Sequence, residues 1–203
     1  MARANAKASS SYDTILNVSI ELFAQHGFDG VTMRKIAHES NITLPTIYHH
    51  FGNKEDLYRA VEAKMYGSHA QSLLVDLHSE ASPEECLRKF TGNLIDSLES
   101  NPSYFKLMQR NVVEDWKNNH QFLVDVSLQS VFDELKKLLN KFIGGSGEGM
   151  QPIIIFSMIF GFLALQPVTK MVNGYKFAKV SRSKKREILI NNVIAFIKIS
   201  PVE

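Results

Sequence analysis

Side chains able to bind an anion gather in one short segment of this 203-residue chain. Tyr48 carries a hydroxyl, His49 and His50 carry imidazoles, and Lys54 carries an ammonium group. Such groups donate hydrogen bonds to oxyanions and to the edges of nucleic-acid bases. Further donors stand just upstream: Thr32, Arg34, Thr43 and Thr46. The pattern favours reversible recognition over covalent chemistry.

Two short helices joined by a tight turn must position these side chains. Thr32 is a typical N-cap for a helix that runs to about Ser40. Asn41 falls in the turn, where a left-handed backbone is often required and asparagine tolerates it. The second helix covers residues 44–51. This arrangement predicts a helix-turn-helix whose second helix enters the major groove of DNA.

The second helix has an inner and an outer face. Ile47 and Phe51 lie one turn apart and are expected to pack inward. The remaining side chains share the outer surface: Leu44, Pro45, Thr46, Tyr48, His49 and His50.

This segment resembles the DNA-binding domain of the TetR family of bacterial transcriptional regulators, over residues about 12–58. The matching residues are Thr32, Ile36-Ala37, Ser40 to Thr43, Thr46 to Phe51 and Lys54 to Leu57, preceded by Leu22 to Ala24, Gly27-Phe28 and Gly30. Ser40-Asn41 replaces the usual Ala-Gly turn, and Pro45 stands near the start of the recognition helix. Proline is acceptable in a first helical turn, so we expect the fold to survive and the base preference to be unusual.

The resemblance implies particular DNA contacts. Tyr48 and Lys54 would hold phosphates, Lys54 near a helix N-terminus that itself attracts anions. Thr32, Arg34 and Thr43 are further phosphate ligands. The base edges would be read by Leu44, Pro45, Thr46 and His49.

Two other interpretations of these residues stay open at this stage. Tyr48 taken alone is as compatible with a buried aromatic side chain of the core as with a DNA contact. His49 and His50 could form part of a metal site, but neighbouring residues on a helix diverge and no second ligand motif is visible.

Arg3 and Lys7 lie in an N-terminal arm that could follow the DNA backbone or a minor groove.

The distribution of charge says more than the total of +2. Residues 1–64 hold seven basic and seven acidic residues, residues 65–175 have a net charge of −3, and residues 176–203 have a net charge of +5. The positive excess thus falls around Lys176 to Arg186, which we expect to be a solvated loop. Any DNA contact must therefore depend on where individual cations lie.

The rest of the chain predicts an all-α protein of about nine helices. Strand patterns are scarce, whereas apolar residues recur at helical spacing throughout. Ser82-Pro83-Glu84-Glu85 has the form of a helix start with a capping box. We place a helix-turn-helix domain at residues 1–60 and a larger helical domain, for ligand binding and dimerisation, at 61–203.

An apolar pocket is expected in the larger domain, as the resemblance also implies. Its candidate lining is aromatic and soft: Tyr104, Phe105, Met108, Val112, Trp116, Phe132, Phe156, Phe160 and Tyr175. Taken singly, each of these side chains is better explained by plain core packing. Glu114 and Asp115 are candidates to meet a cationic ligand and Arg110 an acidic one, with plain exposed charge as the other interpretation of each.

The helices at about 153–165 and 188–199 are the candidates for homodimerisation. The apolar run between Pro152 and Pro167 is too short to span a membrane, which takes roughly 20 residues, so we expect a helix buried in a core or at a subunit interface. No secretory signal is found, and the single Cys86 excludes an intrachain disulfide; both favour the cytoplasm. No cofactor, metal site or enzyme motif is predicted.

These observations predict a dimeric DNA-binding regulator that is not an enzyme. The expected activity is repression from a pseudo-palindromic operator, relieved when a small apolar or amphipathic ligand binds the C-terminal domain. The alternative is the same fold working without a small ligand, as an activator or through a protein partner.

Overall fold

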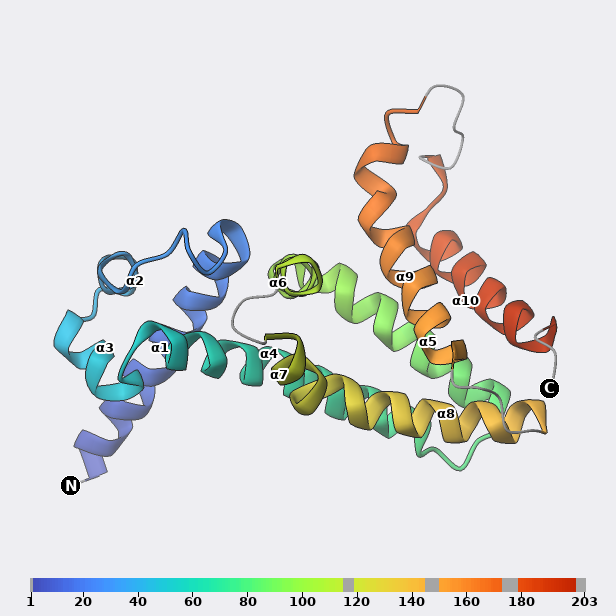
Figure 1. The fold of residues 1–203 in the computed structure, drawn as a ribbon, viewed down its shortest axis with the longest axis horizontal. Coiled ribbons are helices and arrows are strands. Elements are labelled where there is room, and N and C mark those ends of the chain that lie inside the picture. Colours follow the sequence, from blue (N-terminus) through green and yellow to red (C-terminus); the bar gives the residue numbers. More distant parts are fainter. Residues whose placement is uncertain (1, 115–118, 145–149, 173–178, 200–203) are drawn as a thin grey trace. The chain divides into compact units, whose positions relative to one another are not determined.

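The computed structural model describes residues 2–114, 119–144, 150–172 and 179–199, with side chains from Ser11 onward. Within these residues the chain is helical and contains no strand, which confirms the predicted all-α class (Figure 1). It separates into two compact units. Unit 1 combines residues 1–68 with 101–127, and unit 2 combines residues 69–100 with 128–203.

Unit 1 contains the predicted helix-turn-helix. Its helices are α1 (Ala2–His26), α2 (Met33–Ser40), α3 (Leu44–Phe51), the first part of α4 (Lys54–Leu77), α6 (Pro102–Val113) and α7 (Asn119–Leu123). The core consists of side chains that exclude solvent almost completely: Ile15, Phe23, Ile36, Ile47, Leu57, Val61, Tyr66, Tyr104 and Leu107. Residues 101–127 therefore belong to the same compact body as the N-terminal helices. The functional boundary placed at residue 60 stays a prediction.

Local sequence sets the helix ends of unit 1 as expected. The Thr32 hydroxyl accepts the backbone N–H of Lys35 at 3.1 Å, which caps α2. Asn53 accepts the N–H of Asp56 and donates its amide to the Asp56 carboxylate, which forms a reciprocal cap for α4. α1 ends before Gly27, whose φ of +70° suits a residue without Cβ.

Unit 2 is a helical bundle. It contains the end of α4 with α5 (Pro83–Ser100), α8 (Gln129–Ile143), α9 (Met150–Thr169) and α10 (Arg182–Ile199). A π-helical turn at Val124–Leu128 joins α7 to α8 without a break in helical backbone. The predicted capping box of α5 is present, because Ser82 and Glu85 exchange backbone and side-chain hydrogen bonds.

Helix α9 is longer and less buried than the sequence predicts. It covers Met150–Thr169 and takes in both prolines. Pro152 lies in the first turn, where its missing N–H costs no helical hydrogen bond, whereas Pro167 lies inside the last turn, where it removes the bond to the carbonyl of Leu163. Among the described residues it is the one helix whose length and composition would suit a membrane span, and only 22% of its most apolar window is buried. The prediction that this helix is buried in the core of a single chain is therefore wrong. The alternative, that it is buried at a subunit interface, stays a prediction.

Helix α10 begins at Arg182, six residues earlier than predicted. The expectation of a solvated loop through Arg186 is therefore wrong for its last five residues. The cause is ion pairing with α5: Arg182 lies 2.6 Å from the Glu99 carboxylate, and Arg186 lies 2.9 Å from that of Asp96. The first three residues of the predicted loop, 176–178, lie outside the described residues.

Candidate nucleic-acid interface

Helix α3 presents the outer face that its sequence predicts. Ile47 is fully buried and Phe51 is 6% exposed, so these two side chains anchor the helix. Pro45, Tyr48 and His49 are exposed, whereas Leu44, Thr46 and His50 are half-buried at the edges of the face. Tyr48 is 45% exposed, which rules out its interpretation as a core aromatic.

The start of α3 accommodates its proline without disturbance. Pro45 lies in the first turn, where its missing N–H costs no helical hydrogen bond. Thr43 has an extended backbone at the N-cap position, but its side chain does not cap the helix. Its hydroxyl instead pairs with that of Thr46 at 2.8 Å. Two of the predicted contact residues are thus held together at the same end of the helix.

The turn between α2 and α3 shows why Ser40-Asn41 can replace Ala-Gly. Asn41 has φ 53° and ψ 38°, the left-handed conformation expected of it. Among the described residues it is the one non-glycine position with positive φ. The buried Ser40 hydroxyl donates to the carbonyl of Ala37 at 3.4 Å. Asn41 thus supplies the backbone conformation of the turn, and the Ser40 hydroxyl has a hydrogen-bond partner although it is buried.

Lys54 lies at the N-terminus of α4, as predicted for a phosphate ligand. Its Nζ sits 4.1 Å from the centroid of the Phe28 ring, a cation–π distance. Partial burial lowers the pKa of this ammonium group, and the nearby Asp29 opposes the shift. The cation is therefore held in place before any ligand arrives, close to a helix end that attracts anions.

The other predicted phosphate ligands flank α3. Thr32 and Arg34 are exposed at the start of α2. The Thr32 hydroxyl accepts the capping bond and still has its own proton to donate. Arg3 and Lys7 lie in the first turns of α1, where side chains are outside the described part of the chain.

Helix α1 supports α3 through aromatic packing. Tyr12 stacks on Phe51 with ring centroids 4.7 Å apart, and it meets the edge of His50 at 6.0 Å. At the other end of α1, Phe23 meets Tyr58 of α4 edge-to-face at 4.9 Å. The position of α3 thus depends on that of α1.

The predicted pocket residues divide between the two units. Tyr104 and Met108 are buried in unit 1, where the Tyr104 ring lies 5.8 Å from that of Tyr66, while Phe105 is half-buried and Val112 is exposed. In unit 2 Phe132 and Phe156 stack at 4.8 Å, and Phe160 is half-buried on the same helix as Phe156. Trp116 and Tyr175 lie outside the described residues. The pocket as a whole stays a prediction.

Sequence reasoning did not find the polar cluster between α4 and α6. Asn111 donates its amide to Glu62 and to the Tyr66 hydroxyl, and its carbonyl accepts the Tyr58 hydroxyl at 2.7 Å. All four side chains are buried, and burial raises the pKa of both tyrosines above the ordinary value. The spacing of Tyr58, Glu62 and Tyr66 by four residues signals a shared face of α4, but the sequence alone does not reveal the partner helix.

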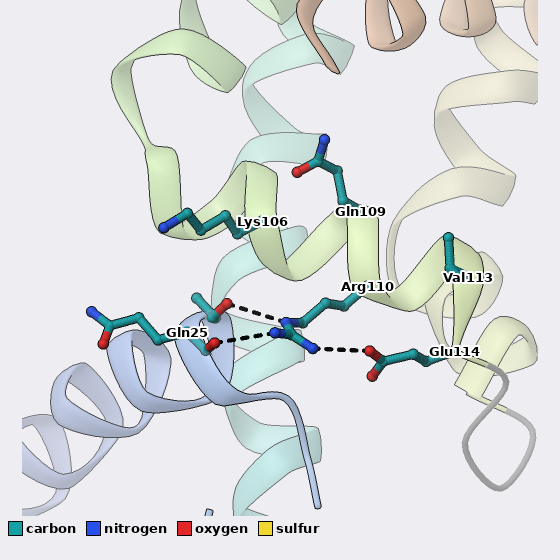
Figure 2. A pocket seen from close by; sticks show the side chains of 7 residues that line it. Gln25, Lys106, Gln109, Arg110, Val113 and Glu114 are labelled. Atoms are coloured by element: carbon teal, nitrogen blue, oxygen red, sulfur yellow. Dashed lines mark hydrogen bonds and ion pairs between the residues drawn. The ribbon is translucent and has the colours of Figure 1, made fainter. Parts of the chain in front are cut away.

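A second missed feature is a hollow where the end of α1 meets α6 (Figure 2). It has a volume of about 490 Å³ and is lined by Ala24, Gln25, Lys106, Gln109, Arg110, Val113 and Glu114. Arg110 and Glu114, predicted to meet a charged ligand, pair with each other at 2.9 Å. Asp115 lies outside the described residues.

Comparisons with known proteins show which family and which proteins this chain resembles. Residues 15–61 match the family described as bacterial regulatory proteins, tetR family. The HTH-type transcriptional repressor NicS of Pseudomonas putida is 29% identical over 105 residues, which cover 50% of this chain and 48% of the relative. The match thus spans about half of that relative. The fatty acid metabolism regulator protein of Bacillus subtilis is 23% identical over 90% of this chain and 95% of its own length.

Solved structures share the fold over nearly the whole chain. A Clostridium perfringens protein assigned as a fatty acid metabolism regulator has a TM-score of 0.72 at 18% identity, with 94% of this chain and 100% of the other covered. The regulator FadR of Bacillus subtilis, solved in complex with stearoyl-CoA, has a TM-score of 0.66 at 22% identity over 92% of this chain and 97% of its own.

Proposed function

We infer that this chain, which belongs to the tetR family of bacterial regulatory proteins through its N-terminal helix-turn-helix, is a DNA-binding transcriptional regulator. The observation that carries the proposal is the exposed face of α3. A buried pair, Ile47 and Phe51, fixes the helix, and the residues predicted to touch DNA lie on the opposite face or along its edges. An eight-residue helix held in this way is of the size that major-groove readers present to bases.

Base readout belongs to the start and middle of α3. Leu44 and Pro45 would contact thymine methyl groups, Thr46 would accept or donate a hydrogen bond, and His49 would donate to a guanine. The phosphate contacts of Thr32, Arg34, Thr43, Tyr48 and Lys54 would surround this reading surface and fix its register.

We propose that the protein works as a homodimer on a pseudo-palindromic operator in the cytoplasm. Support comes from α9, whose exposed apolar side chains include Ile153, Leu165 and Val168, each at least half exposed in the single chain. A second copy would remove this surface from water. Helix α10 already buries its apolar stripe within unit 2, so its part of the interface would be the polar and small side chains Asn191, Asn192 and Ala195.

We further propose that a small apolar or amphipathic ligand of the C-terminal domain releases the protein from DNA. Stearoyl-CoA, bound by the FadR neighbour, is an amphipathic molecule of this class. A ligand can shift the equilibrium only by binding the DNA-incompetent state more tightly than the DNA-bound state. The relative NicS, which is named a transcriptional repressor, favours repression as the sign of regulation.

Selection from a pool of random duplexes tests the DNA proposal. The full chain should enrich a pseudo-palindrome whose half-sites lie about one helical turn apart, roughly 34 Å. Enrichment of no sequence would refute DNA reading by this chain. A selected site without two-fold symmetry would refute the dimeric arrangement.

A thermal-shift series tests the ligand. Acyl-CoA thioesters of increasing chain length are compared with coenzyme A alone and with free fatty acids, followed by competition against the selected duplex. Stabilisation by one class together with loss of the DNA complex supports ligand-induced release. No shift with any of these compounds favours the alternative function, in which the same fold acts as an activator or through a protein partner.

A further inference from the structure

The C-terminal end of α1 is held by a side chain from α6. The Arg110 guanidinium donates through Nε to the carbonyl of Ala24 at 3.3 Å and through Nη2 to that of Gln25 at 3.1 Å. Its remaining terminal nitrogen, Nη1, donates to the Glu114 carboxylate at 2.9 Å. Figure 2 shows the guanidinium between the last turn of α1 and Glu114.

This contact has the chemistry of a helix cap supplied by another helix. The last four carbonyls of an α-helix have no partner within the helix, and together they form the negative end of its dipole. A guanidinium directed at two of them satisfies both acceptors and complements the local charge. Hydrogen bonds from a charged donor are also stronger than those between neutral groups.

Gly27 makes room for the guanidinium. A Cβ added at this position would lie 2.8 Å from Nη1 of Arg110, closer than side chains approach one another. Glycine is therefore favoured at this position for two reasons: it adopts the φ of +70° without strain, and it leaves space for the Arg110 guanidinium. A second contact joins the same two helices, because the Ser103 hydroxyl donates to the Glu21 carboxylate at 2.7 Å.

We propose that Arg110 is a positioning residue for DNA binding, which fixes the end of α1 to α6 and thereby sets the place of α3. The connection within unit 1 runs from Arg110 to α1 and from α1, through Tyr12, to Phe51 and His50 of α3. This inference rests on the proposed function, because it assigns a residue outside the reading surface to the same DNA complex.

The test compares Arg110→Gln with Lys106→Gln in the full chain. Lys106 lies one turn earlier on α6, is exposed, and forms no hydrogen bond or ion pair within the described part of the chain, so its loss removes the same charge without the cap. Two quantities are measured: hydrogen exchange of the peptide covering residues 20–31, and affinity for the selected duplex as a function of salt.

We expect Arg110→Gln to speed exchange in residues 20–31 while exchange in α5 stays unchanged. DNA affinity should fall roughly tenfold, the size of one lost hydrogen bond to a charged group. The salt slope should be unaltered, because Arg110 is assigned no phosphate contact. Lys106→Gln should match the wild type in both measurements.

Gly27→Ala provides an independent check. The strain of alanine at positive φ is the same whether or not residue 110 is arginine, whereas the clash with the guanidinium exists only with Arg110. Gly27→Ala should therefore reduce DNA affinity more in the wild-type background than in Arg110→Gln. Equal effects in the two backgrounds would overturn the assignment of Gly27 to this contact.

Three results would overturn the role of Arg110. These are wild-type exchange in the variant, faster exchange spread equally over unit 1 and α5, and faster local exchange with unchanged DNA affinity. If the wild-type chain selects no DNA, the proposed function fails and the positioning role fails with it. The exchange measurement would then still decide whether Arg110 orders the end of α1.

Discussion

At the scale of single residues, the candidate interface is explained by which side chains are buried and which are left outside. The sequence predicts the inward direction of Ile47 and Phe51, and both are buried. It also predicts the left-handed backbone at Asn41. It does not predict that Lys54 lies over Phe28, because that contact joins segments whose approach depends on the packing of α1 against α4.

Two substitutions test the proposed phosphate contacts, one of a charged side chain and one of a neutral side chain. Lys54→Ala should weaken binding to every DNA sequence and reduce the slope of log affinity against log salt by about one, since one phosphate contact is lost. Tyr48→Phe removes only a neutral hydroxyl, so it should weaken binding to every sequence with little change in slope. Fluorescence anisotropy over a series of salt concentrations measures both effects. Unchanged affinity and slope in the lysine variant would remove Lys54 from the interface.

Asn41 gives a prediction about stability. Asn41→Val should destabilise the protein by about 1–2 kcal/mol, because a β-branched side chain is strained in the left-handed region. Asn41→Gly should be neutral or slightly stabilising. Urea denaturation measures the change in the free energy of unfolding, and equal stability of the valine and glycine variants would contradict the assigned backbone conformation.

At the scale of elements, helix starts were more predictable than helix extents. Thr32, Asn53 and Ser82 signal their caps within four residues, and each cap is present. The extent of α10 depends on Arg182 and Arg186 pairing with α5, whose paired residues lie 83 and 90 residues away in sequence. Charges that suggest a loop in the sequence are therefore neutralised within a helix.

Glu84 gives a pH-dependent prediction for this bundle. Hydrogen bonds from Lys198 of α10 and from Arg88 hold the pKa of this carboxyl below its ordinary value of 4.5. A lowered carboxyl pKa contributes stability above the ordinary pKa, and the contribution is lost as pH falls through the lowered value. Glu84→Gln should thus lower the melting temperature at pH 6. The variant and the wild type should have the same melting temperature well below pH 4.5.

The matched control is Glu80→Gln, which removes an exposed carboxylate from the preceding connection. Thermal unfolding monitored by circular dichroism at several pH values compares both variants with the wild type. A Glu84→Gln deficit that persists undiminished at low pH would show that charge on Glu84 is not its source.

At the scale of the whole molecule, the sequence does not show how the helices are grouped. Residues 101–127 follow two helices of the larger domain in sequence, yet they belong to the compact unit that contains the helix-turn-helix. The reason is long-range contact: Arg110 bonds to carbonyls more than 80 residues upstream, and Asn111 bonds to three side chains of α4. Periodicity identifies helices but not their partners.

The exposed side of α9 gives a prediction about assembly. Leu165→Glu should weaken self-association by at least about a hundredfold, because it puts an unpaired charge into an apolar interface. Val75→Glu is the control, since Val75 is 71% exposed on α4 and outside the proposed interface. Sedimentation equilibrium measures the association of each variant. Dimerisation of Leu165→Glu at wild-type strength would refute the assignment of α9.

The most direct test of the central claim repeats the duplex selection with variants of α3. Pro45→Ala and His49→Ala change the proposed reading surface without touching the buried anchors of the helix. The account predicts that each variant prefers different bases at one symmetric pair of positions and keeps the half-site spacing. Selection of the wild-type sequence by both variants, with undiminished discrimination at every position, would contradict the assignment of α3 as the element that reads DNA.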